Sequence, residues 1–554
     1  MQVNDSFLEI KFLLISAPES NPFSLYSLPL FRIAVLLGYG GIMSKNFFIT
    51  TSIAYVNSVP HIGFAMELVQ ADVLARYHRL KGEKVFFETG TDEHGIKIYR
   101  TAAEQGISPQ EMVDANAARF QALTSALDIS QDYFIRTTNP DHKRGAQKLW
   151  KKMLAQGDIY KGTYEGLYCI GCESYVPEKD LIEGNCAIHK KAPEFLKEEN
   201  YFFKLSKYST KIRELIQSDT LKIVPEARKN EILNIIGEGL PDVSFSRPQQ
   251  MLPWGVPVPD DDTQVMYVWC DALSNYITGI GYEEENETFK SFWPADVHLI
   301  GKDILRFHAG IWIGMLLSAE LAVPKQIYVH GFITSNGQKM SKSIGNVVDP
   351  FGYIDEFGID PVRYYLLKEI STTDDGDFSR DRFTGVYSSD LGNNFGNLVY
   401  RVFSMNEKYF EGRVVKKVMD DPVSLVGAIN SLSGFIEMYH RAIDKFDLKA
   451  ALEITWILVN IGNEYVDRTK PWALAKVDQE ELAAVMYRLL ELVRIIGVML
   501  VPFLPRTAEK LLVQFGESGA IGDLSRALTW GGLIEGSVLV KGGVLFPRLE
   551  EKVV

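Results

Sequence analysis

The sequence predicts an α/β fold: a doubly wound parallel sheet, split by an insertion and followed by a domain of α-helices. Three observations support this fold. Strand-like and helix-like segments alternate over residues 44–160, and the same alternation returns from about residue 265. The segment between them carries paired cysteines. From about residue 385 strand signals stop and long amphipathic helices take over, for example DLKAALEITWILVNIGNEYVD at 447–467.

Four consecutive segments predict the first half of the sheet. NFFITTSIAYV (46–56) is β-branched and aromatic, which favours a strand, and MELVQADVLARYHRL (66–80) has the apolar spacing of a helix. KVFFETGTDEHG (84–95) predicts a buried strand that runs into a loop, and SPQEMVDANAARFQALTSAL (108–127) predicts a second helix. Such β-α-β alternation indicates a parallel, Rossmann-like sheet, in which ligands bind beyond the carboxyl ends of the strands.

Three further segments predict the second half: QVMYVWCDALSNYI at 264–277, DVHLIGKDILRFHAGIWIGMLL at 296–317 and QIYVHGFITSNGQKMSKSIGN at 326–346. We therefore expect five parts along the chain. The third part, the insertion, ends with a stretch from about residue 265 that returns to the sheet domain. The five parts are an N-terminal extension (1–43), the first half of the sheet domain (44–160), the insertion (161–290), the second half (291–384) and the helical domain with its C-terminal tail (385–554).

Composition is that of an ordinary globular protein of several domains. The 554 residues are 46% hydrophobic and 23% charged, with a formal net charge of -13. This charge argues against a protein that coats nucleic acid without specificity, although a local basic face is compatible with it. Residues 1–43 contain apolar runs that are too short and too interrupted for a membrane span. Their acidic residues do not fit a transit peptide, so we expect a poorly ordered extension or an over-extended start.

The insertion carries a predicted metal site. Cys169 and Cys172 form one close pair, and Cys186 and His189 form a second, which is the spacing of ligands around a tetrahedral Zn²⁺. Four protein ligands leave no open position, so this zinc is expected to be structural; buried thiols that merely cluster are the alternative. Cys270 stands apart and is expected to be a core residue. Cysteines used in this way indicate a reducing, cytoplasmic compartment.

Two motifs indicate phosphate chemistry. His61 and Gly63 stand where a helix is expected to begin, and the free N–H groups of a helix N-terminus hold phosphate while glycine allows close approach. A histidine that only caps the helix is the simpler alternative. Lys339 and Lys342 lie in KMSKS (339–343), a predicted mobile cationic loop. Lysines so placed can stabilise a pyrophosphate leaving group, although a solvated surface loop has the same pattern.

Together these two motifs resemble the signatures of the class I aminoacyl-tRNA synthetases. The resemblance narrows to the methionyl-tRNA synthetases and covers residues from about 44 to 510. It rests on segments in the same order, namely TTSIAYVNSVPHIG, FFETGTDEHG, GLYCIGCESY, PWGVPVP, YVWCDALSNY, HLIGKDILRFHAGIW and KMSKSIGNVVDPF. Editing relatives would need a far larger insertion between residues 61 and 339.

The resemblance implies a reaction and a set of residues. It implies that L-methionine is activated with ATP and Mg²⁺ to methionyl-adenylate and then transferred to the terminal adenosine of tRNA-Met. Asp92 would hold the methionine ammonium. Apolar and aromatic pocket walls suit a thioether, and here they would be Ile53, Tyr55, Trp269, Ala272, Leu273, Tyr276, Ile304 and His308. ATP contacts and catalysis would fall to His61, Gly63, the position of Phe64, Lys339 and Lys342.

The resemblance also implies that the helical domain reads the CAU anticodon. Asn397 and Arg401 are four residues apart, hence on one helix face, and Pro471 precedes Trp472. An aromatic platform with hydrogen-bonding neighbours is how proteins read unstacked bases. Without the resemblance, an inward-facing tryptophan in a helical bundle would be the simpler interpretation.

Three positions depart from the family pattern. Phe64 stands where the first signature usually ends in histidine, and Ser52 and Ala54 stand where proline and tyrosine are common. We therefore expect retained activity with altered ATP affinity. Another class I synthetase, such as a cysteinyl enzyme, and a catalytically silent paralogue that binds tRNA or nucleotide are the alternatives. No appended module follows GGVLFPRLEEKVV, so a monomer is expected.

Overall fold

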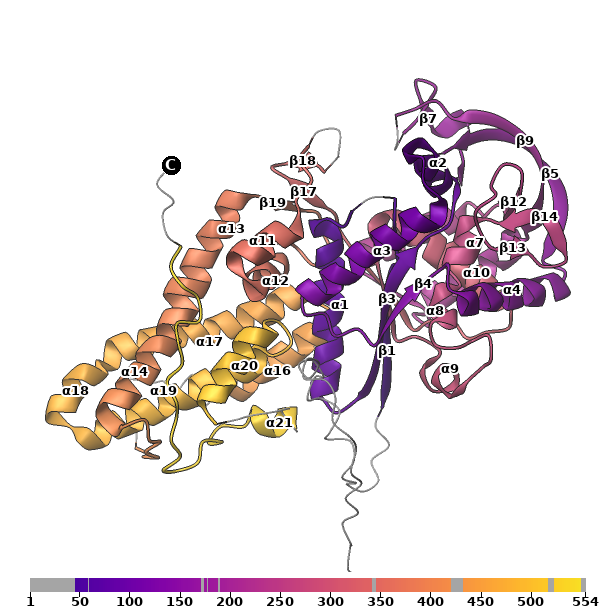
Figure 1. Cartoon of the computed structure of the whole chain (residues 1–554). Coiled ribbons are helices and arrows are strands. Elements are labelled where there is room, and N and C mark those ends of the chain that lie inside the picture. The colour runs from indigo at the N-terminus through magenta and orange to yellow at the C-terminus, as the bar shows by residue number, and fades with distance from the viewer. Residues whose placement is uncertain are drawn as a thin grey trace, which may run out of the picture. The chain divides into compact units, whose positions relative to one another are not determined.

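The computed structural model describes residues 45–57, 59–170, 174–176, 178–187, 190–340, 345–419, 432–516 and 523–549 (Figure 1). The extension predicted over residues 1–43 lies outside this part of the chain.

A seven-stranded sheet forms the centre of the first domain. Its order is β10-β16-β15-β1-β3-β2, with β4 paired off this path to Glu88–Thr91 of β3, and every pair is parallel. The predicted doubly wound sheet is thereby confirmed. The strands are β1 (Asn46–Thr51), β2 (Ala54–Tyr55), β3 (Lys84–Asp92), β4 (Tyr133–Arg136), β10 (Lys222–Val224), β15 (Val297–Gly301) and β16 (Gln326–His330).

Helices connect these strands and cover the sheet. They are α1 (Ile62–Leu80), α2 (Ile96–Gln105), α3 (Pro109–Ala126) and α4 (Pro140–Ala155). α3 begins at a capping box, in which the Ser108 hydroxyl accepts from the backbone N–H of Glu111 and the Glu111 side chain accepts in return. α1 contacts β1 and β3 on one side and α12 (Ile359–Lys368) on the other. Because it is packed from both sides, most of its residues are buried, including polar ones.

The inserted segment forms antiparallel sheets of its own. β5 (Ile159–Cys169) and β9 (Glu194–Phe203) pair along most of their length and curve together in Figure 1. Shorter strands and two helices complete the segment: β6 (Ser174–Tyr175), β7 (Leu181–Ile182), β8 (Asn185–Cys186), α5 (Ser209–Gln217), α6 (Glu226–Gly237), β11 (Val243–Ser244), β12 (Ser246–Pro248), β13 (Pro257–Val258) and β14 (Asp261–Met266). From within this segment β10 joins the edge of the parallel sheet.

The second half of the first domain is built from short helices and a small sheet. The helices are α7 (Val268–Ala272), α8 (Asn275–Thr278), α9 (Glu287–Phe292), a π-helical segment (Phe307–Trp312) and α10 (Ile313–Ser318). The small sheet contains β17 (Ile333–Ser335), β18 (Gln338–Lys339) and β19 (Gly376–Phe378), and α11 (Pro350–Phe357) precedes α12.

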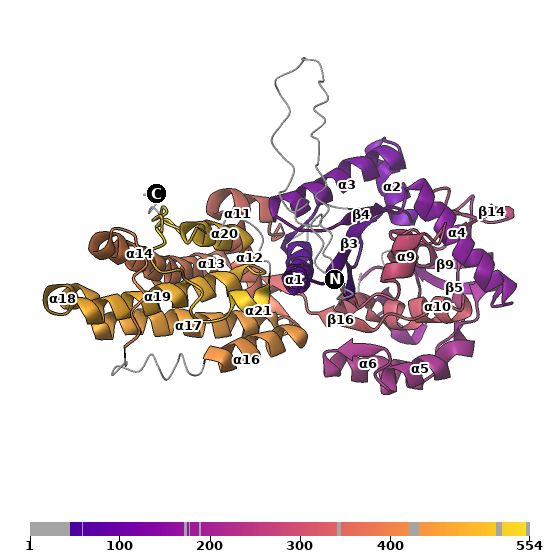
Figure 2. The same ribbon diagram turned by 90° about the horizontal axis from the view of Figure 1, so that it is seen from below.

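Helices dominate the described chain from residue 380 onward, as predicted. They are α13 (Arg380–Val386), a π-helical segment (Tyr387–Gly396), α14 (Asn397–Phe410), α16 (Leu432–Asp444), α17 (Leu448–Thr469), α18 (Pro471–Val477), α19 (Gln479–Leu500), α20 (Pro505–Gln514) and α21 (Leu524–Ala527). α19 is buried at every residue from Leu482 to Leu500 and contacts α14, α17, α18 and α20 (Figure 2). None of the helices described is long and apolar enough to cross a membrane.

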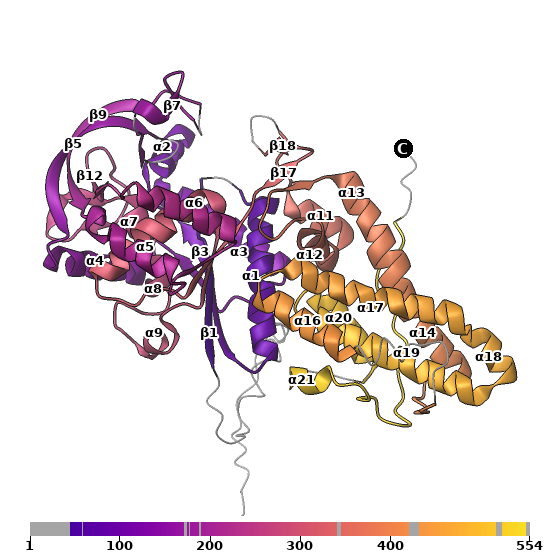
Figure 3. The ribbon, with the colours of Figure 1, turned by 180° about the vertical axis from the view of Figure 1, so that it is seen from behind.

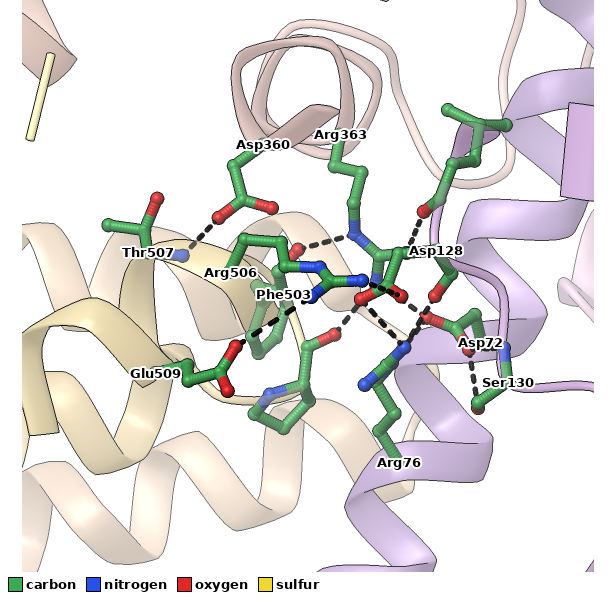
Figure 4. Close-up of polar contacts among 12 residues, drawn as sticks. Asp72, Arg76, Asp128, Ser130, Asp360, Arg363, Phe503, Arg506, Thr507 and Glu509 are labelled. Atoms are coloured by element: carbon green, nitrogen blue, oxygen red, sulfur yellow. Dashed lines mark hydrogen bonds and ion pairs between the residues drawn. The ribbon is translucent and has the colours of Figure 1, made fainter. Parts of the chain in front are cut away.

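Figure 3 shows α1 beside α12, and a buried ion cluster joins α1 to the helical domain (Figure 4). Asp72 in α1 accepts from Arg76 and Arg363 at 2.7 Å each, and from the backbone and hydroxyl of Ser130. Burial alone would raise the pKa of Asp72, but the two guanidinium groups and Ser130 lower it to about 2.

Arg363 in α12 is the centre of this cluster. Its side chain is fully buried and donates to the carbonyl oxygens of Leu127, Pro502 and Phe503 as well as to Asp72. The carbonyls belong to the end of α3 and to the turn between α19 and α20. One side chain therefore ties the sheet domain to the helical domain, while Arg506 closes the outer rim of the cluster by contacting Asp128 at 2.9 Å.

Candidate active site

A cavity of about 1040 Å³ opens beyond the carboxyl ends of the central strands. It is lined from the ends of β2, β3, β15 and β16, the start of α1, and helices α7 and α8. The structure brings all nine residues of the predicted methionine site to its wall: Ile53, Tyr55, Asp92, Trp269, Ala272, Leu273, Tyr276, Ile304 and His308. These residues are separated by up to 255 positions (53 to 308) in the chain, so the sheet topology assembles them.

His61 lies at the mouth of α1, as the sequence predicts. It is the N-cap residue, and its Nδ1 accepts from the backbone N–H of Gly63 at 3.1 Å. Burial lowers the pKa of His61, so the ring is neutral near pH 7 and carries its proton on Nε2. His61, Gly63 and Phe64 all line the cavity. The helix N-terminus and a ring N–H donor are thus available to an anionic ligand.

Phe64 offers this wall an aromatic face in place of a polar group. Its ring packs edge-on against Phe120, with centroids 5.0 Å apart at 82°. In this position the side chain neither donates a hydrogen bond nor carries charge. Residue 64 therefore offers no polar contact to a ligand in the cavity.

A neutral hydrogen-bonded pair forms part of the pocket predicted for the methionine side chain. The Nδ1–H of His308 donates to the Ile304 carbonyl at 3.0 Å, so its Nε2 accepts from the Tyr276 hydroxyl at 2.6 Å. Burial lowers the pKa of His308 to about 4, which keeps the ring neutral. The Trp269 ring stacks on Phe307 with centroids 3.9 Å apart. The result is an aromatic surface without net charge, suited to an apolar side chain.

An ion pair that the sequence analysis missed lies in the same wall. Glu67, one helical turn after Gly63, accepts from the Ser52 hydroxyl at 2.6 Å and from Nε2 of His330 at 2.8 Å. His330 also donates from Nδ1 to the Gly331 carbonyl at 2.7 Å. Burial would lower the pKa of His330, but the hydrogen bond and charge of Glu67 outweigh burial and raise it. In the sequence, the signal for this ion pair was an acidic residue, Glu67, within an apolar helical stretch.

The predicted cationic loop is described only in part. Met340 lines the cavity, and the backbone of Lys339 belongs to β18. Lys342 and the side chain of Lys339 lie outside the part of the chain that is described.

The predicted zinc ligands are likewise described in part. Cys169 ends β5 and Cys186 ends β8, and both side chains are buried. Cys172 and His189 lie outside the described residues. Within the described chain, no three His, Cys, Asp or Glu side chains are arranged to hold a metal. Cys270 is a buried core residue, as expected, and burial raises the pKa of its thiol.

Two of the predicted anticodon residues meet in the helical domain. Arg401 lies over the Trp472 ring at 5.9 Å and pairs with Asp467 at 2.8 Å. Trp472 is 43% exposed, which is unusual for a large aromatic residue in a bundle. Asn397 is the first residue of α14 and is exposed, whereas Pro471 is the buried first residue of α18.

Comparison with known proteins identifies the family. Residues 47–186 and 172–403 match the family of class I tRNA synthetases (M), and residues 426–553 match the anticodon-binding domain of methionyl tRNA ligase. A parallel sheet with a helix N-terminus at its ligand cavity, joined to this helical domain, therefore defines a class I aminoacyl-tRNA synthetase. More particularly, the chain belongs to the methionyl family of these ligases.

Individual relatives span nearly the whole chain. The methionine–tRNA ligase of Clostridium perfringens is 45% identical over 91% of this chain and 78% of its own length. That of Streptomyces coelicolor is 41% identical over 92% and 98%. A solved structure of Mycobacterium tuberculosis methionyl-tRNA synthetase in complex with methionyl-adenylate matches with a TM-score of 0.87 and 37% identity, over 91% of this chain and all of that one.

Proposed function

We propose that the cavity activates L-methionine with ATP, and that the chain then transfers the methionyl group to the 3′ adenosine of tRNA-Met. The methionine carboxylate attacks the α-phosphorus in line, so that methionyl-adenylate forms and pyrophosphate leaves; AMP then leaves when a ribose hydroxyl of the tRNA takes the methionyl group. Mg²⁺ bound with ATP would offset the charge of the phosphates. One observation carries this proposal: the residues expected to hold methionine line the same cavity as His61 and Gly63, which are expected to hold ATP phosphates. Positioning and electrostatics supply the catalysis, without a covalent enzyme intermediate.

Different residues bind methionine, hold the ATP phosphates and stabilise the leaving pyrophosphate. Asp92 binds the methionine ammonium, and the neutral Tyr276–His308 pair faces the thioether. His61, Gly63 and the N-terminus of α1 hold the phosphates. Lys339 and Lys342 stabilise the charge that develops on the leaving pyrophosphate.

ATP–pyrophosphate exchange across all twenty amino acids tests this function, with Lys342→Ala as the control. We expect exchange with methionine alone, and its loss in the control. Exchange with cysteine or another amino acid would overturn the pocket assignment. Folded protein that binds tRNA without any exchange would instead identify a silent paralogue.

We also propose a structural zinc held by Cys169, Cys172, Cys186 and His189. The support is the two buried thiols at the ends of β5 and β8, which suit a soft divalent metal. Bound zinc would stiffen the insertion and take no part in the reaction. Purified protein should contain about one zinc per chain by atomic emission, and Cys172→Ser should lose it. Metal-free protein of unchanged stability would refute the site.

For the helical domain we propose that Asn397, Arg401, Pro471 and Trp472 contribute to reading the CAU anticodon. The exposed Trp472 ring with Arg401 beside it supports this role. Trp472→Ala should lower tRNA charging while leaving methionine-dependent exchange unchanged. An equal loss in both assays would point to a structural role for Trp472.

A further inference from the structure

Three side chains form a buried cluster behind the pocket wall. The Nδ1–H of His94 donates to one oxygen of Asp271 at 2.6 Å, and the Nε2–H of His142 donates to the other at 2.7 Å. All three side chains are almost completely buried. They come from three elements: the loop after β3, α4 and α7. None of the three lines the cavity.

α7 presents two different faces. Val268, Trp269 and Ala272 line the cavity, whereas Asp271 on the opposite side is held by the two histidines. Residues 268–272 form little more than one turn, which is too short to be stable without tertiary contacts. The Asp271 contacts are therefore among the tertiary contacts that hold α7, and with it Trp269, in place.

His94 also belongs to the loop that carries Asp92. Its backbone N–H faces the Asp92 carboxylate at 3.4 Å. The neighbouring Glu93 carbonyl accepts from the Trp254 indole at 2.7 Å, and the His94 ring packs against that indole. One residue thus connects the carboxylate expected at the methionine ammonium with the helix expected at the methionine side chain.

The hydrogen bonds and charges of the cluster indicate that the two histidines hold Asp271 in a fixed position. Burial alone would raise the pKa of Asp271, but the charges and hydrogen bonds of His94 and His142 lower it. Both carboxylate oxygens are occupied, and Nε2 of His94 has no hydrogen-bond partner among the described residues. The only side-chain hydrogen bond of the His94 ring in that part of the chain is therefore the one to Asp271.

We propose that Asp271, held by His94 and His142, is a positioning residue that sets the span between Asp92 and the Trp269 wall. This span decides which side-chain length the pocket accepts. The inference rests on the proposed function, because it takes Asp92 as the ammonium site. Asp271 touches neither substrate nor ATP and acts through α7.

The test compares amino acids of different length in ATP–pyrophosphate exchange. Methionine is compared with ethionine, which is one methylene longer, and norvaline, which is one heavy atom shorter. In Asp271→Asn the amide nitrogen opposes a histidine N–H, so α7 must move. We expect the KM for methionine to rise about tenfold, the preference for methionine over both analogues to fall by a similar factor, and the KM for ATP to stay within about twofold.

Conservative variants provide the matched control. His94→Asn keeps a donor near the Nδ1 position and His142→Gln keeps one near Nε2, whereas His94→Ala and His142→Ala remove them. We expect the first two to retain the preference for methionine and the alanine variants to lose it. This comparison decides the proposal even where Asp271→Asn does not fold, as circular dichroism would show.

Two outcomes would overturn the inference. In the first, the alanine variants and Asp271→Asn lower the unfolding temperature but keep the preference for methionine over ethionine and norvaline. In the second, these variants raise the KM for methionine and the KM for ATP together. Asp92→Asn distinguishes a failure of the proposed function. If Asp92→Asn leaves the KM for methionine unchanged, the ammonium site is wrong; if it raises that KM while the Asp271 cluster has no effect, only this inference fails.

Discussion

At the scale of single residues, the protonation of each buried histidine follows from its partners. His308 faces a carbonyl and a hydroxyl and stays neutral, whereas His330 faces a carbonyl and a carboxylate and so favours the cation. The two rings line the same cavity but favour different protonation states. His308 belongs to the predicted methionine pocket, whereas His330 contacts Glu67 near the start of α1.

Phe64→His should restore a polar contact to ATP. The new imidazole replaces a ring that packs on Phe120 but donates no hydrogen bond. We expect the KM for ATP in exchange to fall roughly tenfold, which corresponds to about 1–2 kcal/mol for one regained hydrogen bond to a charged ligand. Phe64→Leu is the control, because it removes the ring without adding a donor. Equal ATP affinity in Phe64→His and the unmodified chain would show that other groups already compensate.

At the scale of elements, the N-terminus of α1 combines stability with ligand approach. The His61 cap satisfies one free N–H of the helix, and the absent side chain at Gly63 leaves room for the His61 ring. A Cβ at Gly63 would lie 3.0 Å from Cε1 and 3.1 Å from Nδ1 of His61. A side chain at position 63 would therefore displace the imidazole by a few tenths of an ångström.

Gly63→Ala should separate stability from activity. Alanine favours the helix by up to about 1 kcal/mol over glycine, so the unfolding temperature should stay the same or rise slightly. The displaced His61 ring should lower the kcat/KM for ATP in exchange by about 10- to 100-fold. Thermal unfolding and exchange on one preparation check both expectations. Unchanged exchange would show that the ring adapts without loss.

At the scale of the whole molecule, one buried ion cluster joins the sheet domain to the helical domain (Figure 4). Arg363 and Asp72 are fully buried, whereas Arg506 at the rim has 54% of its side chain exposed. Buried pairs are costly to break, because the remaining charge has no solvent, while exposed pairs contribute little. Position within the cluster should therefore decide the effect of each substitution.

Arg363→Met should destabilise the chain far more than Arg506→Ala. The first leaves three carbonyls without their donor and weakens the pairing of Asp72, so we expect a loss of about 3–5 kcal/mol in the free energy of unfolding. The second should cost less than about 1 kcal/mol. Urea unfolding followed by circular dichroism measures both. Equal losses would contradict the assigned role of burial.

Asp72 should also make the free energy of unfolding depend on pH. Its pKa is held at about 2, below the ordinary value of 3.8, so its contribution is complete above pH 4 and is lost as pH falls toward 2. The contribution amounts to about 2 kcal/mol. The difference in unfolding free energy between the unmodified chain and Asp72→Asn should shrink over that interval. A difference that stays constant between pH 5 and about pH 2.5 would show that Asp72 is not responsible.

Local patterns in the sequence sufficed for the parallel sheet and the helices, and the family resemblance supplied the residues of the cavity wall. Strand and helix periodicity is a property of neighbouring residues, and the signature motifs and the family resemblance pointed to His61, Asp92 and Trp269, all of which line the cavity. Packing decided the rest. His330 meets Glu67 across 263 positions, and His94 meets Asp271 across 177, because the tertiary structure places the end of β16 against α1 and the loop after β3 against α7. Such pairings depend on topology and burial, which no single stretch of residues encodes.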